Sequence, residues 1–456
     1  MAESSDVDQS TSAQRAQHHS PPSVCVVGVG TVGLHEALAF EEAGHDTAGY
    51  DIDVERIRAC RRGEDSTGAV DEDRLARSEC LFTMDPTCIE AAEYVIVAIP
   101  TATDDGTPTM ESVAAAAETV GHHIVPETTV VLVSTVYPGA TEQVFVPTLE
   151  AASGLAADTD FSVAHAPVRL SPRTDGSTVI PETRLVGADS AAVADEVAEL
   201  FERVVDTVHV VDTIRATEAA KCVENVQRDV NIALVNELAH LLGEMNIDTR
   251  AVLDAAGTKW NFQQYEPGLV GGECVPIAPQ FIMERARRAG ATPRLLEHAR
   301  AVNDRMVDRV TETTVSALAH RADRRHGTEP TTPTDPATVL LLGLSYKPDS
   351  SSLEATPAKS VARRLERRGV RVVGHDPLVD ADAAADALDI DVLPSMEGAK
   401  ADAVAILVDH SAFASLTIDD IRKGTSPVPV VVDLPGVFDP DSDHATVIYR
   451  DVSDVS

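Results

Sequence analysis

A cysteine close behind a pair of glycines is the first residue whose side chain could do chemistry. Residues 268–281 read GLVGGECVPIAPQF, which places Cys274 behind Gly271 and Gly272. A thiolate in such a loop could act as a nucleophile and attack an aldehyde. The alternative is a small side chain buried in a turn, and the choice depends on the chemistry that the rest of the chain can supply.

A lysine and an asparagine form a second candidate group. Lys221 and Asn225 stand four residues apart in TEAAKCVENVQRDVNIALVNELAHLLGEM, a stretch with helical periodicity. Residues at this spacing share one face of a helix, so both side chains can point into one cleft. The ammonium could then polarise a substrate oxygen that the amide holds in place. Such a pair can also be an exposed polar stripe, and Cys274 is what favours a site over that alternative.

A glycine motif near the N-terminus could hold a dinucleotide. In VCVVGVGTVG, residues 24–33, three glycines follow a strand pattern directly, and LHEALAFEEAG continues as a helix. Such glycines permit a tight turn and a close approach of a pyrophosphate to the helix N-terminus. An acidic residue closes the next strand, where it can bind the ribose hydroxyls of NAD and repel a 2′-phosphate. The motif therefore predicts NAD binding, the alternative being glycines that serve only helix-to-strand packing. The expected cofactor contacts are Gly28, Gly30, Thr31, Val32, Gly33 and Asp51.

The elements that must position these residues follow from the pattern of short apolar runs. From Ser23 to about Val211, β-branched runs such as VCVVGV and YVIVAIP alternate with alanine-rich stretches, which is typical of a parallel sheet covered by helices. From about Thr213 to Ala322 only helical periodicity remains, and an α/β pattern returns in TVLLLGLSYKP. We therefore predict an α/β protein with these parts: a disordered tail at 1–22, an NAD-binding Rossmann domain at 23–212, a helical domain at 213–322, a linker at 323–337 and a Rossmann-like domain at 338–456.

The charge of the chain excludes one class of partner. Lys and Arg total 37 against 74 for Asp and Glu, which gives a formal net charge of -37. A charge of that size repels polyphosphate backbones, so we expect no nucleic-acid partner. The acidic residues are spread along the chain, and self-repulsion of this strength is tolerable in concentrated salt. This pattern favours a halophile's cytosolic protein over an ordinary acidic one.

The sequence also bounds the compartment and the metal chemistry. Residues 1–22 lack the apolar segment of a signal peptide, and no apolar run approaches the roughly 20 residues that cross a bilayer. We therefore expect a cytoplasmic protein without a membrane partner. Six cysteines in 456 residues do not indicate a disulfide framework, and the histidines lack the spacing of a metal site.

Ordered motifs along nearly the whole chain resemble the nucleotide-sugar 6-dehydrogenases of the UDP-glucose/GDP-mannose dehydrogenase family. The resemblance is strongest to the branch that oxidises UDP-N-acetylmannosamine and UDP-N-acetylglucosamine. The matching stretches are VGVGTVG at 27–33, IPTATDDGTP at 99–108, STVYPGATE at 134–142, AAKCVENVQRDVNIALVNELA at 219–239, VGGECVP at 270–276, ARAVNDRM at 299–306, GLSYKPD at 343–349, GHDP at 374–377 and DHSAF at 409–413.

The resemblance implies a fold and an activity. The fold has an NAD-binding domain, a central helical domain that forms homodimers, and a C-terminal Rossmann-like domain that binds the UDP-sugar. The activity is the oxidation of the C6 alcohol of a UDP-N-acetylhexosamine to a carboxylate, with two NAD molecules reduced, for surface polysaccharide or glycoprotein glycans. In that scheme Cys274 captures the aldehyde as a thiohemiacetal, which is oxidised to a thioester and released by water. Lys221 and Asn225 would stabilise the oxyanions or position the water.

The same resemblance assigns further contacts. Thr101 and Thr135 match positions that line the nicotinamide pocket, and Lys347 matches a residue that faces the nucleotide sugar. The expected substrate contacts are Arg169, Lys221, Asn225, Gly271 and Lys347.

Four departures from the family pattern remove a catalytic carboxylate or an arginine near the substrate. Val168 stands where a glutamate activates water, and Ala278 stands where an aspartate supports the general base. Glu354 and Pro435 replace arginines near the substrate. Because loss of a positioned base typically costs about 10²–10⁴-fold in rate, hydrolysis of the thioester on Cys274 should slow most.

Three interpretations are compatible with these observations. The first is a working dehydrogenase in which another carboxylate, such as Glu218, Glu224 or Glu273, replaces the missing ones. The second is a catalytically impaired paralogue that binds NAD and regulates or pairs with an active dehydrogenase. The third is a β-hydroxyacid dehydrogenase, which is disfavoured because that class needs neither Cys274 nor a second α/β domain.

Overall fold

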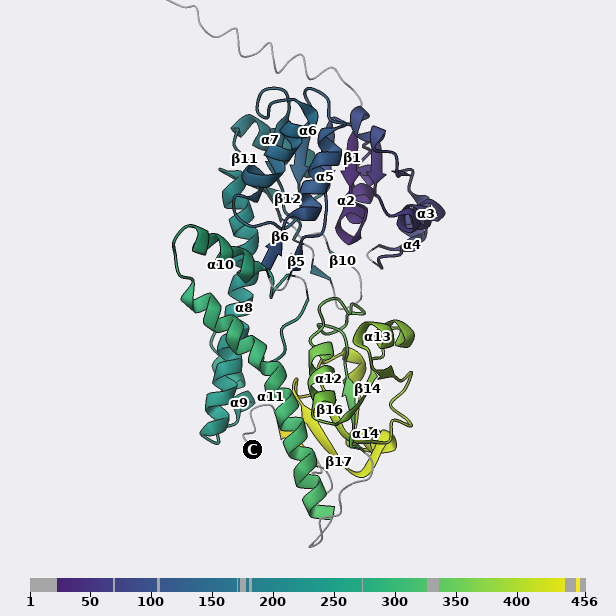
Figure 1. Ribbon diagram of the computed structural model, residues 1–456, viewed down its shortest axis with the longest axis vertical. Coiled ribbons are helices and arrows are strands. Elements are labelled where there is room, and N and C mark those ends of the chain that lie inside the picture. The colour runs from purple at the N-terminus through teal and green to yellow at the C-terminus, as the bar shows by residue number, and fades with distance from the viewer. Residues whose placement is uncertain are drawn as a thin grey trace, which may run out of the picture. The chain divides into compact units, whose positions relative to one another are not determined.

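The structure is a computed structural model, and the chain folds into two compact units (Figure 1). The units divide inside one long helix, between Cys222 and Val223. The predicted tail at 1–22 and Glu273 lie outside the described residues. The described residues are 23–68, 70–104, 107–169, 171–172, 178–179, 183–272, 274–325, 336–438 and 448–451.

The first unit is built on a sheet with the strand order β12-β11-β8-β7-β4-β1-β2-β3. Its strands are β1 (Val24–Val27), β2 (Thr47–Tyr50), β3 (Leu81–Thr83), β4 (Tyr94–Val97), β7 (Thr129–Leu132), β8 (Ser162–His165), β11 (Thr183–Ala188) and β12 (Thr207–Val211). Two small ladders pair β5 (Ala102–Asp104) with β6 (Thr107–Thr109) and β9 (Ser171–Pro172) with β10 (Thr178–Val179). The helices are α2 (Thr31–Glu42), α3 (Val54–Arg62), α4 (Glu72–Arg77), η1 (Pro86–Ala91), α5 (Glu111–Gly121), η2 (Thr141–Phe145), α6 (Val146–Ser153) and α7 (Ala191–Phe201).

Strand β1 shows why its sequence is apolar throughout. Successive side chains of a strand point to opposite faces of the sheet. Val24 and Val26 belong to a buried cluster that includes the apolar residues of α2, whereas Cys25 and Val27 belong to another that includes those of α5. A strand covered by helices on both faces has no solvent-facing positions, which is the arrangement that the continuous apolar run predicts.

One strand direction differs from the predicted parallel sheet. β11 pairs antiparallel with β8, while the other pairings in this sheet are parallel. A parallel neighbour needs a crossover connection, usually a helix. The chain between β8 and β11 instead contains the antiparallel β9 and β10.

The second unit contains long helices and a second sheet. Its helical part comprises most of α8 (Ile214–Glu244), then α9 (Thr249–Gly257), α10 (Ala278–Arg288) and α11 (Arg294–Arg325). Asp248 caps α9, because its side chain accepts hydrogen bonds from the N–H groups of Arg250 and Ala251. Among the helices that the structure describes, none combines the length and apolar character that a membrane crossing requires.

The second sheet is parallel, with the order β15-β14-β13-β16-β17-β18. Met306, Val310 and Ala317 of α11 lie in the same buried cluster as Leu341 of β13. The end of the predicted helical region therefore shares a core with the C-terminal sheet. The strands are β13 (Thr338–Leu342), β14 (Arg371–His375), β15 (Asp391–Val392), β16 (Ala401–Ile406), β17 (Thr425–Asp433) and β18 (Ile448–Asp451). The accompanying helices are α12 (Ala358–Arg367), α13 (Ala381–Leu388), η3 (Ser411–Phe413) and α14 (Ile418–Gly424).

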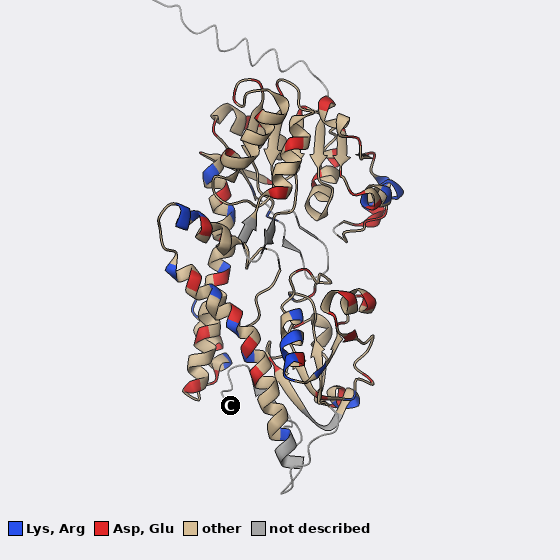
Figure 2. Cartoon of the chain, in the orientation of Figure 1, with Lys and Arg blue, Asp and Glu red and all other residues tan. Residues whose placement is uncertain are grey.

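Acidic side chains are distributed over many of the described elements, and basic side chains gather on a few, including α12 (Figure 2). The basic face of α12 has structural partners. Arg364 forms an ion pair with Asp308 of α11, and the Nζ atom of Lys359 donates to the Ala387 carbonyl at 2.5 Å. These contacts account for part of the positive charge on α12 without a bound anion.

Candidate functional site

The glycine loop has the shape that a bound pyrophosphate requires. Gly28 has a φ of +89°, and a Cβ atom there would lie 2.6 Å from the Ala98 carbonyl oxygen. A Cβ on Gly33 would overlap the Gly28 backbone. Both positions therefore require glycine, one for the turn and one for close packing of α2 on β1.

Gly30 leaves the start of α2 open. It occupies the N-cap position without a side-chain capping bond, and a Cβ there would meet no described atom within 4 Å. The first N–H groups of a helix lack partners within it and favour an anion. The glycine loop and the first residues of α2, Thr31 and Val32, therefore fit the diphosphate of NAD.

Asp51 lies at the end of β2, beside the glycine loop. Its carboxylate accepts the N–H of Val29 at 2.9 Å, the N–H of Asp53 at 2.9 Å and Nη1 of Arg56 at 3.1 Å. These donors fix the carboxylate at the edge of the loop, where the ribose of NAD is expected. Arg56, five residues further along the chain in the first turn of α3, was not among the predicted site residues.

Thr101 and Thr135 follow β4 and β7, which are neighbouring strands of the sheet. The N–H of Ile99 donates to Oγ of Ser134 at 2.9 Å, so the chain segments leaving these strands are bound together. Because β4 also neighbours β1, the two threonines leave the sheet at the same edge as the glycine loop. This placement is compatible with the predicted nicotinamide contacts.

Lys221 lies in the part of α8 that belongs to the first unit. Its side chain is buried, with 8% exposure, which does not fit an exposed polar stripe. One turn earlier, the buried Glu218 accepts the N–H of Gly139 at 2.5 Å and of Thr141 at 2.9 Å. Burial raises the pKa of Glu218, although these two donors oppose the shift. The carboxylate of Glu218 therefore fixes the loop after β7 to α8, and both of its oxygens already accept hydrogen bonds from that loop.

His165 is a buried neighbour of Lys221 that was not predicted. Its Nε2 atom lies 3.1 Å from the Ser134 carbonyl oxygen and must donate to it, which leaves the proton off Nδ1. Burial lowers the pKa of His165 to about 4, against the hydrogen bond to Ser134 and with a contribution from the charge of Lys221. A neutral imidazole therefore accompanies Lys221.

Asn225 and Cys274 belong to the second unit. Asn225 is 9% exposed, and its Nδ2 atom has no hydrogen-bond partner among the described residues. A buried amide donor without a partner is rare in proteins and fits a group that awaits a ligand. Among the cysteines, all of which the structure describes, Cys274 is the exposed one.

The loop that carries Cys274 packs closely against the C-terminal sheet domain. A Cβ on Gly271 would lie 2.6 Å from Cδ of Pro357, and a Cβ on Gly272, which has a φ of +79°, would lie 2.8 Å from the Tyr346 ring. The N–H of Gly272 also donates to the Ala355 carbonyl at 3.2 Å. The two glycines therefore bring the backbone before Cys274 into contact with the segment that carries Lys347.

Lys347 and Cys274 lie within electrostatic range of each other in the second unit. Burial lowers the pKa of Lys347, repulsion from Arg228 lowers it further, and Cys274 opposes the shift. The ammonium lies 5.6 Å from the centre of the Tyr346 ring, within the range of a cation–π contact. The structure thus brings together two predicted site residues, and it adds Arg228 and Tyr346.

The four departures from the family pattern occupy distinct environments. Val168 is 7% exposed and belongs to an apolar cluster, and Ala278 is 1% exposed at the start of α10. The N–H of Glu354 donates to Oγ of Ser352 at 3.3 Å. None of these three side chains supplies the base or guanidinium of the family pattern.

Near Pro435 a different arginine is present. Nη1 of Arg250 donates to the Gly436 carbonyl at 3.0 Å. Gly436 has a φ of +78°, and a Cβ there would overlap the guanidinium. Arg250 therefore occupies the space beside the position from which the family arginine is missing. Arg169, a predicted substrate contact, is half-buried, and its Nη1 atom donates to the Thr183 carbonyl at 3.1 Å.

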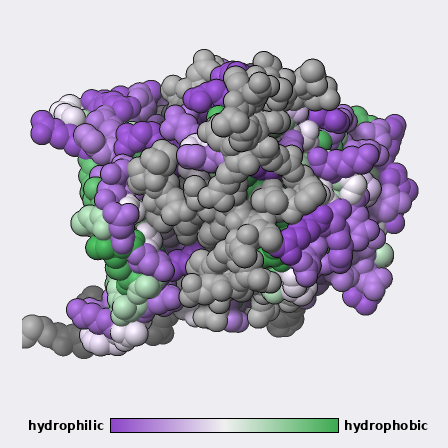
Figure 3. Space-filling view, turned by 90° about the horizontal axis from the view of Figure 1, so that it is seen from below, coloured by the Kyte–Doolittle hydropathy of each residue, from purple (hydrophilic) through white to green (hydrophobic). Residues whose placement is uncertain are grey.

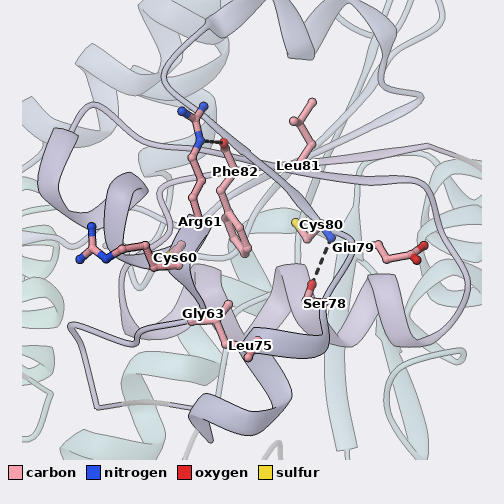
Figure 4. Close-up of a pocket in the computed structure, with 11 residues that line it drawn as sticks. Cys60, Arg61, Gly63, Leu75, Ser78, Glu79, Cys80, Leu81 and Phe82 are labelled. Atoms are coloured by element: carbon pink, nitrogen blue, oxygen red, sulfur yellow. Dashed lines mark hydrogen bonds between the residues drawn. The ribbon is translucent and has the colours of Figure 1, made fainter.

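The first unit also contains a hollow of about 330 Å³ lined by residues of α3, α4 and β3 and their flanking segments (Figure 4). In it, Nε of Arg61 donates to the Phe82 carbonyl and the N–H of Cys80 donates to Oγ of Ser78. Burial raises the pKa of Cys80 to about 12, so this thiol is unreactive. The hollow contains none of the predicted site residues. The described residues also contain no cluster of side chains suited to a metal ion.

The glycine loop and Asp51 place the chain among the NAD-binding oxidoreductases of Rossmann type. Three domains of the UDP-glucose/GDP-mannose dehydrogenase family match it: the NAD binding domain over residues 22–205, the central domain over 215–305 and the UDP binding domain over 340–440. The chain belongs to this family.

Individual relatives match over nearly the full chain. The chain is 35% identical over 421 residues to the UDP-N-acetyl-D-glucosamine 6-dehydrogenase of Pseudomonas aeruginosa, covering 92% of this chain and 97% of that protein. It is 34% identical over 430 residues to Protein CapL of Staphylococcus aureus, covering 94% and 98%. The solved structure of a UDP-D-ManNAc dehydrogenase from Pyrococcus horikoshii matches with a TM-score of 0.79 at 26% identity, covering 95% of this chain and 99% of that one.

Proposed function

We propose that this protein oxidises the C6 alcohol of a UDP-N-acetylhexosamine to the carboxylate, with NAD as the oxidant in both steps. The observation that carries the proposal is the exposed Cys274 thiol on a glycine loop beside Lys347, in a chain of this family. Its product would supply an acidic sugar for surface polysaccharide or glycoprotein glycans. Relatives named for UDP-N-acetylglucosamine and UDP-N-acetylmannosamine support the substrate class.

The residues divide the chemistry between them. The glycine loop and Asp51 would hold NAD, which would supply the hydride acceptor for both oxidation steps at C6. Cys274 adds its sulfur to the C6 aldehyde, and loss of a second hydride converts the thiohemiacetal into a thioester. Water then breaks the C–S bond, which returns the thiol and releases the carboxylate. Lys221 and Asn225 donate hydrogen bonds to the oxygen on C6 as it gains negative charge.

Val168 determines what we expect of the last step, the hydrolysis of the thioester. An apolar side chain cannot take a proton from the attacking water, so we propose that hydrolysis of the thioester limits turnover. Glu218 is engaged by two backbone donors and is a poor substitute. The impaired paralogue stays the alternative, and similarity over nearly the whole chain to named dehydrogenases favours a working enzyme.

We further propose a homodimer formed through α8. Leu234, Leu238 and Leu241 of α8 and Met245, which directly follows the helix, are 53%, 36%, 48% and 57% exposed, and we call these residues the α8 stripe. Their spacing puts them on one face of the helix. Hydrophobic residues appear on the left of the view from below, the side on which α8 and α9 lie in Figure 1 (Figure 3). A second copy of the same face would cover this stripe, as in an isologous interface.

The proposed function is tested by NADH absorbance over time. Purified protein in molar KCl is mixed with NAD and a panel of UDP-hexoses and UDP-N-acetylhexosamines. The salt is chosen because the net charge of -37 favours a halophile's cytoplasm, which is the compartment that we propose. We expect two NADH per sugar over many turnovers. A burst of two NADH per enzyme without further turnover would show a thioester that is not hydrolysed, and no signal despite NAD binding would support the impaired paralogue.

A further inference from the structure

A buried histidine contacts the backbone of the segment that carries Lys347. His410 follows β16 and is 0% exposed. Its Nδ1 atom lies 3.0 Å from the backbone N of Asp349, and its Nε2 atom lies 3.0 Å from Oδ2 of Asp376. A backbone N–H can only donate, so Nδ1 is the acceptor and the proton sits on Nε2. The two contacts thus define one tautomer, with His410 bound between Asp349 and Asp376.

Asp376 holds the other end of the same segment. We call Leu344–Asp349 the lysine segment. Oδ2 of Asp376 accepts the N–H of Leu344 at 2.7 Å and of Ser345 at 3.2 Å, in addition to His410. Burial opposes ionisation of Asp376, yet the bond from His410 and the backbone donors hold the pKa of this carboxyl below its usual value. One ionised carboxylate therefore binds the start of the lysine segment and, through His410, its end.

The end of the lysine segment has an unusual backbone conformation. Asp349 has a φ of +53°, in the left-handed region that non-glycine residues rarely adopt. Its carboxylate accepts the N–H of Ser411 at 2.7 Å and the hydroxyl of Ser411 at 2.6 Å. Inside the segment, Oγ of Ser345 donates to the Lys347 carbonyl at 2.9 Å. Lys347 thus sits in a turn that is fixed before, at and after it.

We propose that His410 is a positioning residue for Lys347: its Nδ1 atom holds the Asp349 turn so that the ammonium stays beside Cys274. This inference rests on the proposed function, because it takes binding of the UDP-sugar as the step that the turn affects. His410 is fully buried and acts only through the lysine segment. Loss of the Nδ1 acceptor would leave the part-buried N–H of Asp349 without this partner and would release a turn held at positive φ.

The test compares two amide variants of His410. Asn places its amide near the position of Nδ1 and can accept from Asp349, whereas Gln reaches the position of Nε2 and keeps only the bond to Asp376. We expect His410→Gln to raise KM for the UDP-sugar about tenfold, the value of about one lost hydrogen bond, and His410→Asn to raise it much less. KM for NAD should stay unchanged in both, because the cofactor residues lie in the first unit. Equal sugar KM values in the two variants, or a parallel rise in KM for NAD, would overturn the proposal.

A second readout separates this inference from the proposed function. If the wild-type protein reduces no NAD with any UDP-sugar, the proposed function fails, and amide hydrogen exchange in the lysine segment then decides the role of His410. We expect faster exchange there in His410→Gln than in His410→Asn, and equal exchange would refute the positioning role. Should the histidine variants not fold, Ser411→Ala removes one exposed bond to Asp349. It should raise the sugar KM or speed the same exchange, and no change in either would also refute it.

Discussion

Replacing Gly272 by alanine should damage the cysteine loop through two separable costs. A φ of +79° costs a residue with a Cβ about 1–2 kcal/mol. The added methyl group would lie 2.8 Å from two atoms of the Tyr346 ring, and overpacking of this kind costs about 1–3 kcal/mol. Gly268→Ala is the matched control in the same loop, because its Cβ meets no described atom within 4 Å.

Urea unfolding followed by circular dichroism measures this prediction. We expect Gly272→Ala to lower the free energy of unfolding by about 2–5 kcal/mol, the sum of the two costs, and Gly268→Ala to change it by less than about 1 kcal/mol. The double variant with Tyr346→Ala should recover the steric part, so that the cycle shows a coupling of about 1–3 kcal/mol. The second NADH per sugar should also appear more slowly, because Cys274 follows the displaced backbone. If Gly272→Ala matched Gly268→Ala in both assays, the contact between the cysteine loop and Tyr346 would be wrong.

Three further predictions concern other parts of the molecule. Cys274→Ala should abolish the second hydride transfer and spare NAD binding, measured as NADH yield and by calorimetry; double oxidation in that variant would refute the covalent mechanism. The folded pKa of His165 lies below its unfolded value, so its contribution to stability is complete above about pH 6.5 and is lost as the pH falls through about 4. The loss amounts to about 3 kcal/mol. In His165→Gln, which can still donate to Ser134, the free energy of unfolding should therefore depend less on pH between these values. Leu241→Glu should produce monomers in light scattering while Arg58→Glu on α3 does not; a dimer that survives Leu241→Glu would exclude the α8 stripe.

The sequence predicted those features that depend on neighbours in the chain. Gly28 and Gly33 belong to a local motif whose glycines serve a turn and a close approach, and both needs are visible in the structure. The α/β architecture with a helical middle followed from periodicity and is confirmed by the family match. The direction of β11 was not predictable, because the side-chain pattern of a strand is the same in either direction.

Contacts between distant segments account for what the sequence could not predict. Arg228 comes close to Lys347 only when the helical region packs against the C-terminal sheet, and His410 reaches the segment that carries Lys347 only when that sheet forms. Lys347 itself was assigned by resemblance alone. Its residue type and position in SYKP carry no periodic signal that would distinguish it from a surface lysine. The roles of Cys274, Lys221 and Asn225 stay predictions that the kinetic experiments decide.

The contact between Arg250 and Gly436 restricts the order in which mutations can accumulate. Any side chain at position 436 would occupy the space of the Arg250 guanidinium, and the positive φ adds a further cost there. If Arg250 were lost first, glycine at position 436 would remain acceptable, and a later side chain at that position would no longer clash with a guanidinium. The reverse order would pass through a chain that carries both the clash and the strain. Lineages that keep an arginine at position 250 should therefore keep glycine at position 436, a dependence between two sites that lie far apart in the gene.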